Sequence, residues 1–301
     1  MNYKMIVKSP EKRQAILNCL NWIPDAIMIK IQYWIKTDRK LDLKNPKRFT
    51  EKLQWYKINY KNPDMVRCVD KYEVRQYVIE KGLEEILNPV FGVYENSNQI
   101  NINALPSRFV AKDTLGGGAR SIIICRDKEK IDFKEFFFQI SKWTVEKKCG
   151  GGREWPYYSG KKGRILIEKF IESENGEVGL LDYKFFCFNG KARYLYVITD
   201  RKIGKSATLG IFDIDFNQLN VARADEKILT REVKKPTNYK KMIEVAEKLA
   251  QGFPHVRVDL YNIGGKIIFG ELTFFDGSGY MIFIPDEFDF ELGREFQIPI
   301  K

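Results

Sequence analysis

The feature that most constrains this chain is a predicted β-hairpin near the C-terminus in which polar residues alternate with apolar ones. Two strands, 256–261 and 266–273, flank the turn Asn-Ile-Gly-Gly at 262–265. The polar residues that strand alternation places on shared faces are Arg257, Asp259, Glu271 and Thr273. Because most of their neighbours are apolar, we expect the hairpin to be central in the fold, where carboxylates need partners or a ligand.

Cross-strand pairing of this hairpin can bring Asp259 and Glu271 to one pocket. Two carboxylates are a sufficient protein contribution to an Mg²⁺ site, because the ion keeps waters and takes phosphate oxygens as its other ligands. Arg257 beside them could neutralise charge on a transferred phosphoryl group. The alternative is a surface hairpin with a cross-strand ion pair, and the residues alone leave both open.

The composition indicates a folded, basic protein. With 301 residues, of which 44% are apolar and 14% aromatic, the chain can bury a substantial core and form one bilobal unit or two domains. Fifty-one Lys and Arg against 40 Asp and Glu give a net charge of +11. This charge favours anionic partners such as nucleotides, acidic sugars, nucleic acid or an anionic membrane face, with a solvated basic surface as the alternative.

The cysteines argue against a zinc site or a disulfide framework. They are scattered, odd in number and accompanied by a single histidine: Cys19, Cys68, Cys125, Cys149 and Cys187. No C-x-x-C pair occurs, so a reducing, cytoplasmic setting fits best. The apolar stretch 15–29 is interrupted by residues such as Pro24 and Asp25, so we expect neither a signal sequence nor a membrane span there.

Residues 10–36 are predicted to form one helix, with a rough apolar stripe that ends with Trp34 and Ile35. The favoured interpretation is a helix packed on its own domain. The alternative is a helix that docks on a partner or lies on a membrane surface, at the inner face of the cell membrane.

Elsewhere the pattern predicts helices and strands that alternate without a regular βαβ rhythm. The predicted helices are 49–60, 70–81, 133–146 and 239–251, and the further strands are 90–94, 109–112, 121–125, 164–171, 183–188 and 192–199. Residues 213–223 form either another strand or a loop. This mixture predicts an α+β fold.

One of these strands ends in a lysine, and a glycine cluster follows it. Strand 109–112 ends in Lys112, and Gly116, Gly117 and Gly118 follow a few residues later. Successive backbone N–H groups without Cβ crowding can cradle β- and γ-phosphates, and the lysine adds a point charge. A glycine cluster alone more often marks a turn, as the second cluster at 150–152 illustrates.

Taken in order, these features resemble the ATP-grasp ligases. The hairpin with Arg-Val-Asp, a turn, Glu-x-Thr and a Gly-Ser-Gly loop is similar to the metal-binding hairpin of that family, whose pattern ends in Glu-x-Asn. The resemblance implies an ATP-grasp fold in which two α+β lobes enclose Mg-ATP. It further implies that Asp259 and Glu271 are metal ligands and that Thr273 occupies the position of the family's asparagine. Lys112 and the glycine loop after it would cover the phosphates of ATP.

The same resemblance implies six further nucleotide contacts: Lys71, Glu168, Lys169, Ile171, Asp182 and Lys184. Lys71 is similar to the first ATP lysine, which approaches the α-phosphate. The strand 164–171 resembles the hinge between the lobes, where backbone groups read the adenine edge. Asp182 aligns with the acidic residue that holds the ribose, and Lys184 is placed to reach a phosphate.

Four sequence segments resemble, more specifically, the TupA-like ATP-grasp family of bacterial surface-polysaccharide gene clusters. They are Leu-Lys-Asn-Pro-Lys-Arg-Phe-Thr-Glu-Lys-Leu-Gln-Trp at 43–55, Asp-Lys-Tyr-Glu-Val-Arg at 70–75, Glu-Trp-Pro-Tyr at 154–157 and Asp-Tyr-Lys-Phe-Phe-Cys-Phe-Asn-Gly-Lys at 182–191. On this basis residues 1–65 are an N-terminal helical segment and 66–301 an ATP-grasp domain. Its first lobe ends near residue 167, its hinge is 168–171, and its C-terminal lobe begins near 172.

That family implies ligation of an amine, often an amino acid, to a sugar carboxylate of a surface polymer or its precursor. The acyl-phosphate chemistry needs no nucleophilic side chain, and Lys112 and Arg257 would stabilise charge on the transferred group. His255, on the strand face of Arg257, is interpreted as a packed strand histidine, with a substrate contact as the alternative. The rival functions are a nucleic-acid-binding basic protein, a sugar kinase on the same fold and an ATP-grasp scaffold without turnover.

Overall fold

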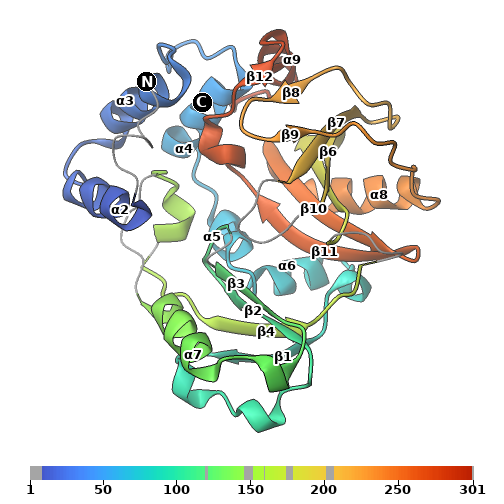
Figure 1. The fold of residues 1–301 in the computed structure, drawn as a ribbon. Coiled ribbons are helices and arrows are strands. Elements are labelled where there is room, and N and C mark those ends of the chain that lie inside the picture. The colour runs from blue at the N-terminus through green and yellow to red at the C-terminus, as the bar shows by residue number, and fades with distance from the viewer. Residues whose placement is uncertain are drawn as a thin grey trace.

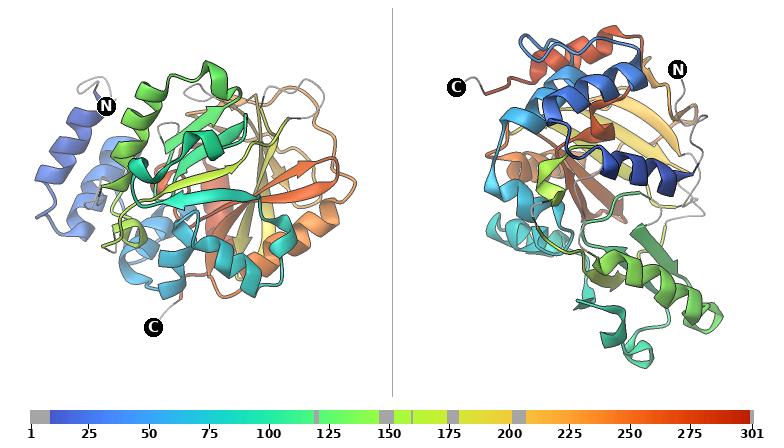
Figure 2. Two further views of the ribbon diagram at one scale, coloured as in Figure 1. Left: turned by 90° about the horizontal axis from the view of Figure 1, so that it is seen from below. Right: turned by 90° about the vertical axis from the view of Figure 1, so that its left-hand side faces the viewer.

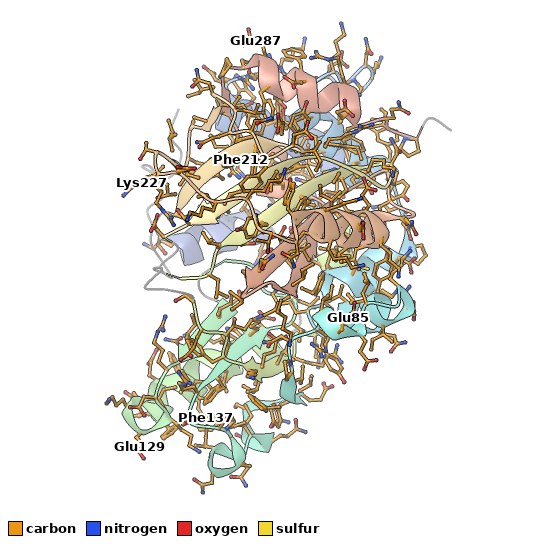
Figure 3. All side chains as sticks on the ribbon, turned by 90° about the vertical axis from the view of Figure 1, so that its right-hand side faces the viewer. Glu85, Glu129, Phe137, Phe212, Lys227 and Glu287 are labelled. Carbon is orange, nitrogen blue, oxygen red and sulfur yellow. The ribbon has the colours of Figure 1, made fainter. Side chains whose placement is uncertain are left out.

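The computed structural model describes residues 9–118, 121–145, 152–158, 160–173, 179–200 and 207–299. Two lobes, each built on a mainly antiparallel sheet, lie one above the other in Figure 1. In Figure 3, Phe137 marks the small lobe, and Phe212 and Glu287 mark the large lobe. Helices and strands occur in both lobes, which confirms the predicted α+β class.

The small lobe is a four-stranded antiparallel sheet in the order β1-β4-β2-β3. Its strands are β1 (Val90–Tyr94), β2 (Phe109–Asp113), β3 (Ile122–Cys125) and β4 (Ile165–Lys169). Helix α7 (Phe133–Ser141) packs on this sheet, and its buried Phe136 lies edge-on against Phe109 of β2. Asp132 begins the helix by accepting a hydrogen bond from the backbone N–H of Glu135 at 3.1 Å.

The large lobe is a six-stranded sheet in the order β11-β10-β5-β6-β7-β9. Its strands are β5 (Asp182–Phe188), β6 (Lys191–Thr199), β7 (Thr208–Asp213), β9 (Lys227–Ile228), β10 (His255–Ile263) and β11 (Lys266–Thr273). Phe185 of β5 packs against Tyr239 of helix α8 (Tyr239–Ala250), and Phe186 packs against Phe49 on the other face. Every residue of β5 is therefore buried.

Three helices from the first 80 residues belong to the core of the large lobe. They are α4 (Phe49–Asn59), α5 (Pro63–Val69) and α6 (Val74–Glu80), and each buries apolar residues there. The small-lobe sheet has a separate core with α7. Residues 49–80 thus share the core of the C-terminal sheet, on both sides of the boundary predicted at residue 65.

The predicted single helix 10–36 is two helices, α2 (Pro10–Cys19) and α3 (Asp25–Thr37). Pro24 lies between them, because proline lacks a backbone N–H and disfavours a helical residue before it. In the part of the chain that the structure describes, none of the helices is both long and apolar enough to cross a membrane.

Several further elements were not predicted, among them α5, β7, β9, β12 (Phe283–Ile284) and α9 (Glu287–Glu295), whereas β8 (Ala222–Arg223) lies within the stretch 213–223 that was predicted as a strand or a loop. Strand β7 extends the large sheet, strand β12 pairs with β8, and helix α9 packs on α4. Helix α6 also begins later than predicted, at Val74. The carboxylate of Asp70 accepts from the backbone N–H groups of Tyr72 and Glu73, so residues 70–73 form a turn.

Candidate active site

The hairpin of β10 and β11 is less central than predicted. Strand β10 lies between β5 and β11 and is buried from His255 to Leu260, whereas β11 is the edge strand of the six-stranded sheet. The register of the hairpin pairs Asp259 with Glu271 and Arg257 with Thr273. The two carboxylates therefore lie side by side across the strands, which confirms the predicted pairing. Gly270 permits the bulge that follows Asp259, because a Cβ at this position would lie 2.9 Å from the carbonyl oxygen of Asp259.

Arg257 connects the polar residues of the hairpin. Its guanidinium donates to both carboxylate oxygens of Asp259 at 2.7 Å and to Thr273 Oγ1 at 3.0 Å. It forms further ion pairs with Glu271 at 3.5 Å and with Asp276. Burial alone would lower the pKa of Arg257, but the charges of Asp259 and Asp276 outweigh burial and raise it. The hairpin is thus a buried charge network rather than a surface ion pair.

Strand β5 adds a lysine and a carboxylate to this network. Lys184, whose cross-strand partner is Asp259, donates to the carboxylate of Asp259 and forms an ion pair with Asp182 at 2.8 Å. Burial alone would raise the pKa of Asp259, but the charges of Arg257 and Lys184 hold it below its usual value. The structure therefore brings the predicted ribose and phosphate residues next to the predicted metal ligands.

The donor chemistry of the hairpin fits Mg²⁺. Asp259 and Glu271 offer carboxylate oxygens and Thr273 a hydroxyl, all of them hard oxygen donors. Glu271 is the accessible carboxylate, since 44% of its side chain is exposed and its contact with Arg257 is a loose 3.5 Å. Among the described residues no group of three or more His, Cys, Asp or Glu is arranged to hold a metal. An ion here would thus depend on waters and phosphate oxygens to complete its shell.

Lys112 lies near the end of β2 and is paired with Glu168 of β4. Its Nζ is 2.6 Å from Glu168 Oε2, and 24% of its side chain is exposed. In the loop that follows, a Cβ on Gly116 would lie 2.3 Å from a serine oxygen, Gly117 has open space around it, and Gly118 has a φ of +75°. The loop therefore requires glycine at two positions and leaves its middle uncrowded, as a phosphate cradle needs.

Lys71 is attached to the same loop. Its Nζ donates to the carbonyl oxygen of Gly116, and its backbone N–H donates to the carbonyl oxygen of Thr114 at 2.9 Å. Thr114 in turn exchanges hydrogen bonds of 3.0 Å with Arg164, just before β4. The two predicted lysines of the front half are therefore joined to one loop.

Helix α5 and the 3-10 segment η7 (Trp155–Tyr158) lie near the hairpin. Helix α5 ends two residues before Lys71 and packs against both β11 and η7, and Figure 1 shows it between the two sheets. Burial raises the pKa of Tyr157 in η7, and the charges of Glu154 and Glu271 raise it further. Helix α5, which precedes Lys71 in the chain, therefore contacts both η7 and the hairpin strand β11.

The predicted hinge residues lie at the end of β4. Lys169 uses both backbone groups within the protein: its N–H donates to Pro89 O at 2.9 Å, and its carbonyl oxygen accepts from Asn88 Nδ2 at 2.8 Å. Glu168 is paired with Lys112, and Ile171 lies just beyond the strand. A nucleotide that reads the Lys169 backbone would have to replace these bonds.

A largely buried group of polar side chains, Gln54, Lys57 and Glu154, holds the 3-10 segment η8 (Asp276–Gly279), and the sequence did not predict it. We call this group the polar clamp. Residues 277–279 of η8 all have positive φ. Lys57 of α4 donates to Ser278 O at 2.7 Å and to Ser278 Oγ at 3.1 Å, and this hydroxyl donates to the Glu154 carboxylate. Burial lowers the pKa of Lys57 to about 7. Nothing in the sequence marks this lysine, because exposed lysines are common in helices.

The clamp fixes η8 beside the charge network. Gln54 of α4 donates to Gly279 O at 2.7 Å, and a Cβ on Gly279 would collide with the same amide at 2.5 Å. At the other end, Asp276 accepts from Arg257 and lies 3.7 Å from Arg223. The Gly-Ser-Gly loop is therefore an ordered wall of the site. Of the second glycine cluster, residues 150 and 151 lie outside the described part of the chain.

His255 is a packed strand histidine, as interpreted from the sequence. Its ring centroid lies 4.8 Å from that of Phe188 and 5.0 Å from that of Phe49, and its Nδ1 is 3.0 Å from Cys187 O. Burial lowers the pKa of His255 to about 3, so the ring is neutral at physiological pH.

We expect the substitution His255→Gln to remove part of the acid sensitivity of folding. The folded-state pKa of about 3 lies below the ordinary value of 6.5, so the unfolded chain binds the extra proton between these values. The stability linked to His255 is complete above pH 6.5 and falls as pH decreases, by about 1.4 kcal/mol per unit. Urea unfolding at pH 7 and pH 5 should show a loss about 2 kcal/mol larger in the natural protein. Equal losses in the two proteins would exclude this linkage.

The small lobe carries a lysine followed by a glycine loop, and the large lobe carries a hairpin with two carboxylates. This is the arrangement expected of an ATP-grasp protein. The family model described as TupA-like ATP-grasp matches residues 51–297. The chain belongs to this family.

Several solved structures have a similar fold. D-Alanine–D-alanine ligase from Bacillus anthracis is 18% identical, with a TM-score of 0.42, over 69% of this chain and 57% of that one. The Helicobacter pylori enzyme of the same name is 14% identical, with a TM-score of 0.43, over 85% and 68%. N5-carboxyaminoimidazole synthetase from Staphylococcus aureus, complexed with ADP, is 12% identical, with a TM-score of 0.40, over 69% and 44%.

This chain spans little more than half the length of the Bacillus anthracis enzyme. A search of the curated proteins found no match. Because the TM-scores of these structures lie below 0.5, the family assignment rests on the family model.

Proposed function

We propose that ATP binds between the lobes, with its triphosphate between the Lys112 loop and the β10–β11 hairpin. The observation that carries this proposal is the cross-strand pair of Asp259 and Glu271, held by Arg257 of the buried strand β10. Buried charge networks contribute little to stability compared with apolar packing, so their presence needs another reason. The contact of α5 with β11, close to Lys71, supports the same location.

Magnesium is the metal that this donor set suits. Asp259 and Glu271 would hold it, with Thr273 as the third donor, and the ion would supply charge neutralisation at the phosphate oxygens. The protein's own part is orientation: Arg257 and Lys184 fix the Asp259 carboxylate before any ligand arrives. The Glu271 carboxylate stays accessible to the metal ion and its ligands.

The proposed reaction joins a carboxylate to an amine. A substrate carboxylate oxygen attacks the γ-phosphorus of ATP, the bond to the bridging oxygen breaks, and an acyl phosphate and ADP result. The amine nitrogen then attacks the acyl carbon, phosphate leaves, and the nitrogen loses a proton to give the amide. Lys112 would stabilise charge on the transferred group and the glycine loop would exclude water, so no nucleophilic side chain is required.

For the substrates we propose a uronic-acid sugar of a capsular or other surface polysaccharide, or its precursor, and an amino acid or other amine. The family assignment and the net charge of +11, which favours an acidic glycan, support this choice. We place the reaction in the cytoplasm, where ATP is available. The ordered wall at η8, next to Asp276, is suited to orient one of the two substrates.

Incubation with ATP, Mg²⁺ and a panel of uronic acids and amines tests this function through ADP release and product mass. We expect ADP release to require the carboxylate, and the product to carry the mass of an amide. A phosphorylated sugar formed without amine would indicate the kinase, and saturable ATP binding without turnover would indicate an idle scaffold. Steeply salt-dependent binding to polynucleotides, without ATP binding, would indicate a nucleic-acid-binding protein.

Replacing Lys112 by Met is expected to lower kcat/KM for ATP about a hundredfold, because a charge that stabilises the transferred phosphoryl group is removed. The fold should persist, since Arg75 stays 3.9 Å from Glu168 after the substitution. Lys130→Met is the matched control, because Lys130 belongs to the same lobe and 84% of its side chain is exposed. ADP-release kinetics of both variants provide the measurement, and equal activity would remove Lys112 from the site.

A further inference from the structure

Large apolar side chains that remain exposed are concentrated on the N-terminal helices. In the described residues, five of them lie between positions 16 and 34: Ile16, Trp22, Ile27, Ile31 and Trp34. Trp22 is 79% exposed and Trp34 61% exposed, and they are the two exposed tryptophans in the described ranges. A single exposed apolar residue needs no explanation, but such a concentration marks an interaction surface.

Helix α3 presents three of these residues on one face. Ile27, Ile31 and Trp34 are separated by four and three positions, so their side chains form one stripe along the helix. Lys30 is exposed within the same stretch, and its long side chain can reach past the stripe. The exposed face of α3 is therefore apolar with a positive charge at its border.

The opposite face of α3 is fastened to the enzyme. Tyr33 is buried, and its hydroxyl lies 2.8 Å from Thr50 Oγ1 of α4. Gln32 accepts from the hydroxyl of Tyr280 at 2.6 Å, and Tyr280 directly follows the η8 wall. The packing of α3 on its own fold is thus complete without the apolar stripe, which is left for another partner.

The connection between α2 and α3 is also held in place. Arg153, which is 5% exposed, donates to Leu20 O at 2.8 Å, to Ile23 O at 3.1 Å and to the Asp25 carboxylate at 2.7 Å. Trp22 lies within this connection. Both helices lie on the side of the molecule that faces the viewer in the right-hand view of Figure 2. The exposed apolar residues are therefore presented from a fixed platform on one side of the enzyme.

Positive charge is concentrated in the N-terminal region that contains these helices, and two of its arginines, Arg39 and Arg48, are ion-paired with Asp286. Residues 1–48 contain eleven Lys or Arg and four Asp or Glu, which gives +7 out of the net +11 of the whole chain. The remaining 253 residues together contribute only +4. A partner of this segment should therefore be negatively charged as well as apolar.

We propose that this N-terminal face, defined by Ile16, Trp22, Ile27, Lys30, Ile31 and Trp34, docks in the plane of an anionic lipid bilayer. Tryptophan is favoured at the boundary between lipid headgroups and acyl chains, and lysines bind the anionic headgroups. A bilayer satisfies both requirements of this face, the apolar contact and the negative charge. The docked enzyme would turn its N-terminal helices toward the membrane and hold its site beside the lipid surface.

The full chain should co-sediment with vesicles made of equal parts of phosphatidylcholine and phosphatidylglycerol. Binding should fall at least about tenfold in vesicles of phosphatidylcholine alone and should weaken as salt is raised, because the basic segment contributes electrostatically. The variant Trp34→Ser should lower binding to the anionic vesicles about tenfold through the loss of buried apolar area.

Phe138→Ser is the matched control, because Phe138 is a large aromatic residue of the small lobe with a similar exposure of 57%. We expect it to bind anionic vesicles as the natural protein does. The proposal is overturned if the natural protein stays in solution with anionic vesicles, or if the two variants lose binding equally. Concentration-dependent dimers that disappear in Trp34→Ser, without vesicle binding, would assign the face to a second copy of the chain instead.

Discussion

The substitution Glu271→Gln is expected to lower the rate of ATP turnover by at least about a hundredfold while leaving the fold intact. The change removes one charge from the pair with Asp259 and keeps the size and shape of the side chain. Its effect on stability should stay below about 1 kcal/mol, because the side chain is 44% exposed and its ion pair with Arg257 is loose. ADP release and thermal unfolding, measured on the same preparation, separate the two effects.

Glu287→Gln provides the control for this variant. Glu287 is an exposed glutamate in the first turn of α9, at the far end of the large lobe in Figure 3. It should turn over ATP at the natural rate. If Glu271→Gln retained natural turnover as well, the assignment of Glu271 to the nucleotide and metal site would be wrong.

The second large effect is expected on stability. Replacing Arg257 by Met should lower the free energy of unfolding by about 3–5 kcal/mol, because the buried carboxylates of Asp259 and Asp276 lose their shared partner. Urea unfolding at neutral pH gives the measurement. Arg193→Met, which alters an arginine that is 52% exposed and paired with Glu295, should change stability by less than about 0.5 kcal/mol.

A double variant separates loss of charge compensation from loss of packing. Asp276→Asn removes one of the two carboxylates that Arg257 serves, so the combination with Arg257→Met should be less destabilised than the sum of the single changes. Strict additivity would show that Arg257 stabilises the protein by packing. It would also remove the physical basis for a preformed charge network at the hairpin.

The hairpin is the part of the site that could be predicted best from the sequence. Strand alternation and the Gly-Gly turn set the register as far as Leu260 and Phe269. The bulge at Gly270 then places Asp259 opposite Glu271, a shift that these local rules do not give. The bridge from Arg257 to Asp276 could not be predicted in this way. It depends on the course of the chain after β11, where three successive residues adopt left-handed conformations.

Buried polar residues on helices were harder to predict. Lys57 lies in a helix that mixes apolar, polar and charged residues, and its side chain is buried against the η8 loop and Tyr280. Strand β7 was missed because Gly210 weakens its strand pattern, and pairing with β6 establishes it as a strand. The break at Pro24 could have been predicted, since proline rarely lies inside a helix.

The measurement that tests the central claim most directly is an experimental structure of the enzyme with Mg²⁺ and a non-hydrolysable ATP analogue. We predict that the triphosphate lies between Lys112 and the β10–β11 hairpin, with Asp259 and Glu271 on its metal side. A nucleotide bound outside this space, with Glu271 far from every phosphate oxygen, would contradict the proposed site.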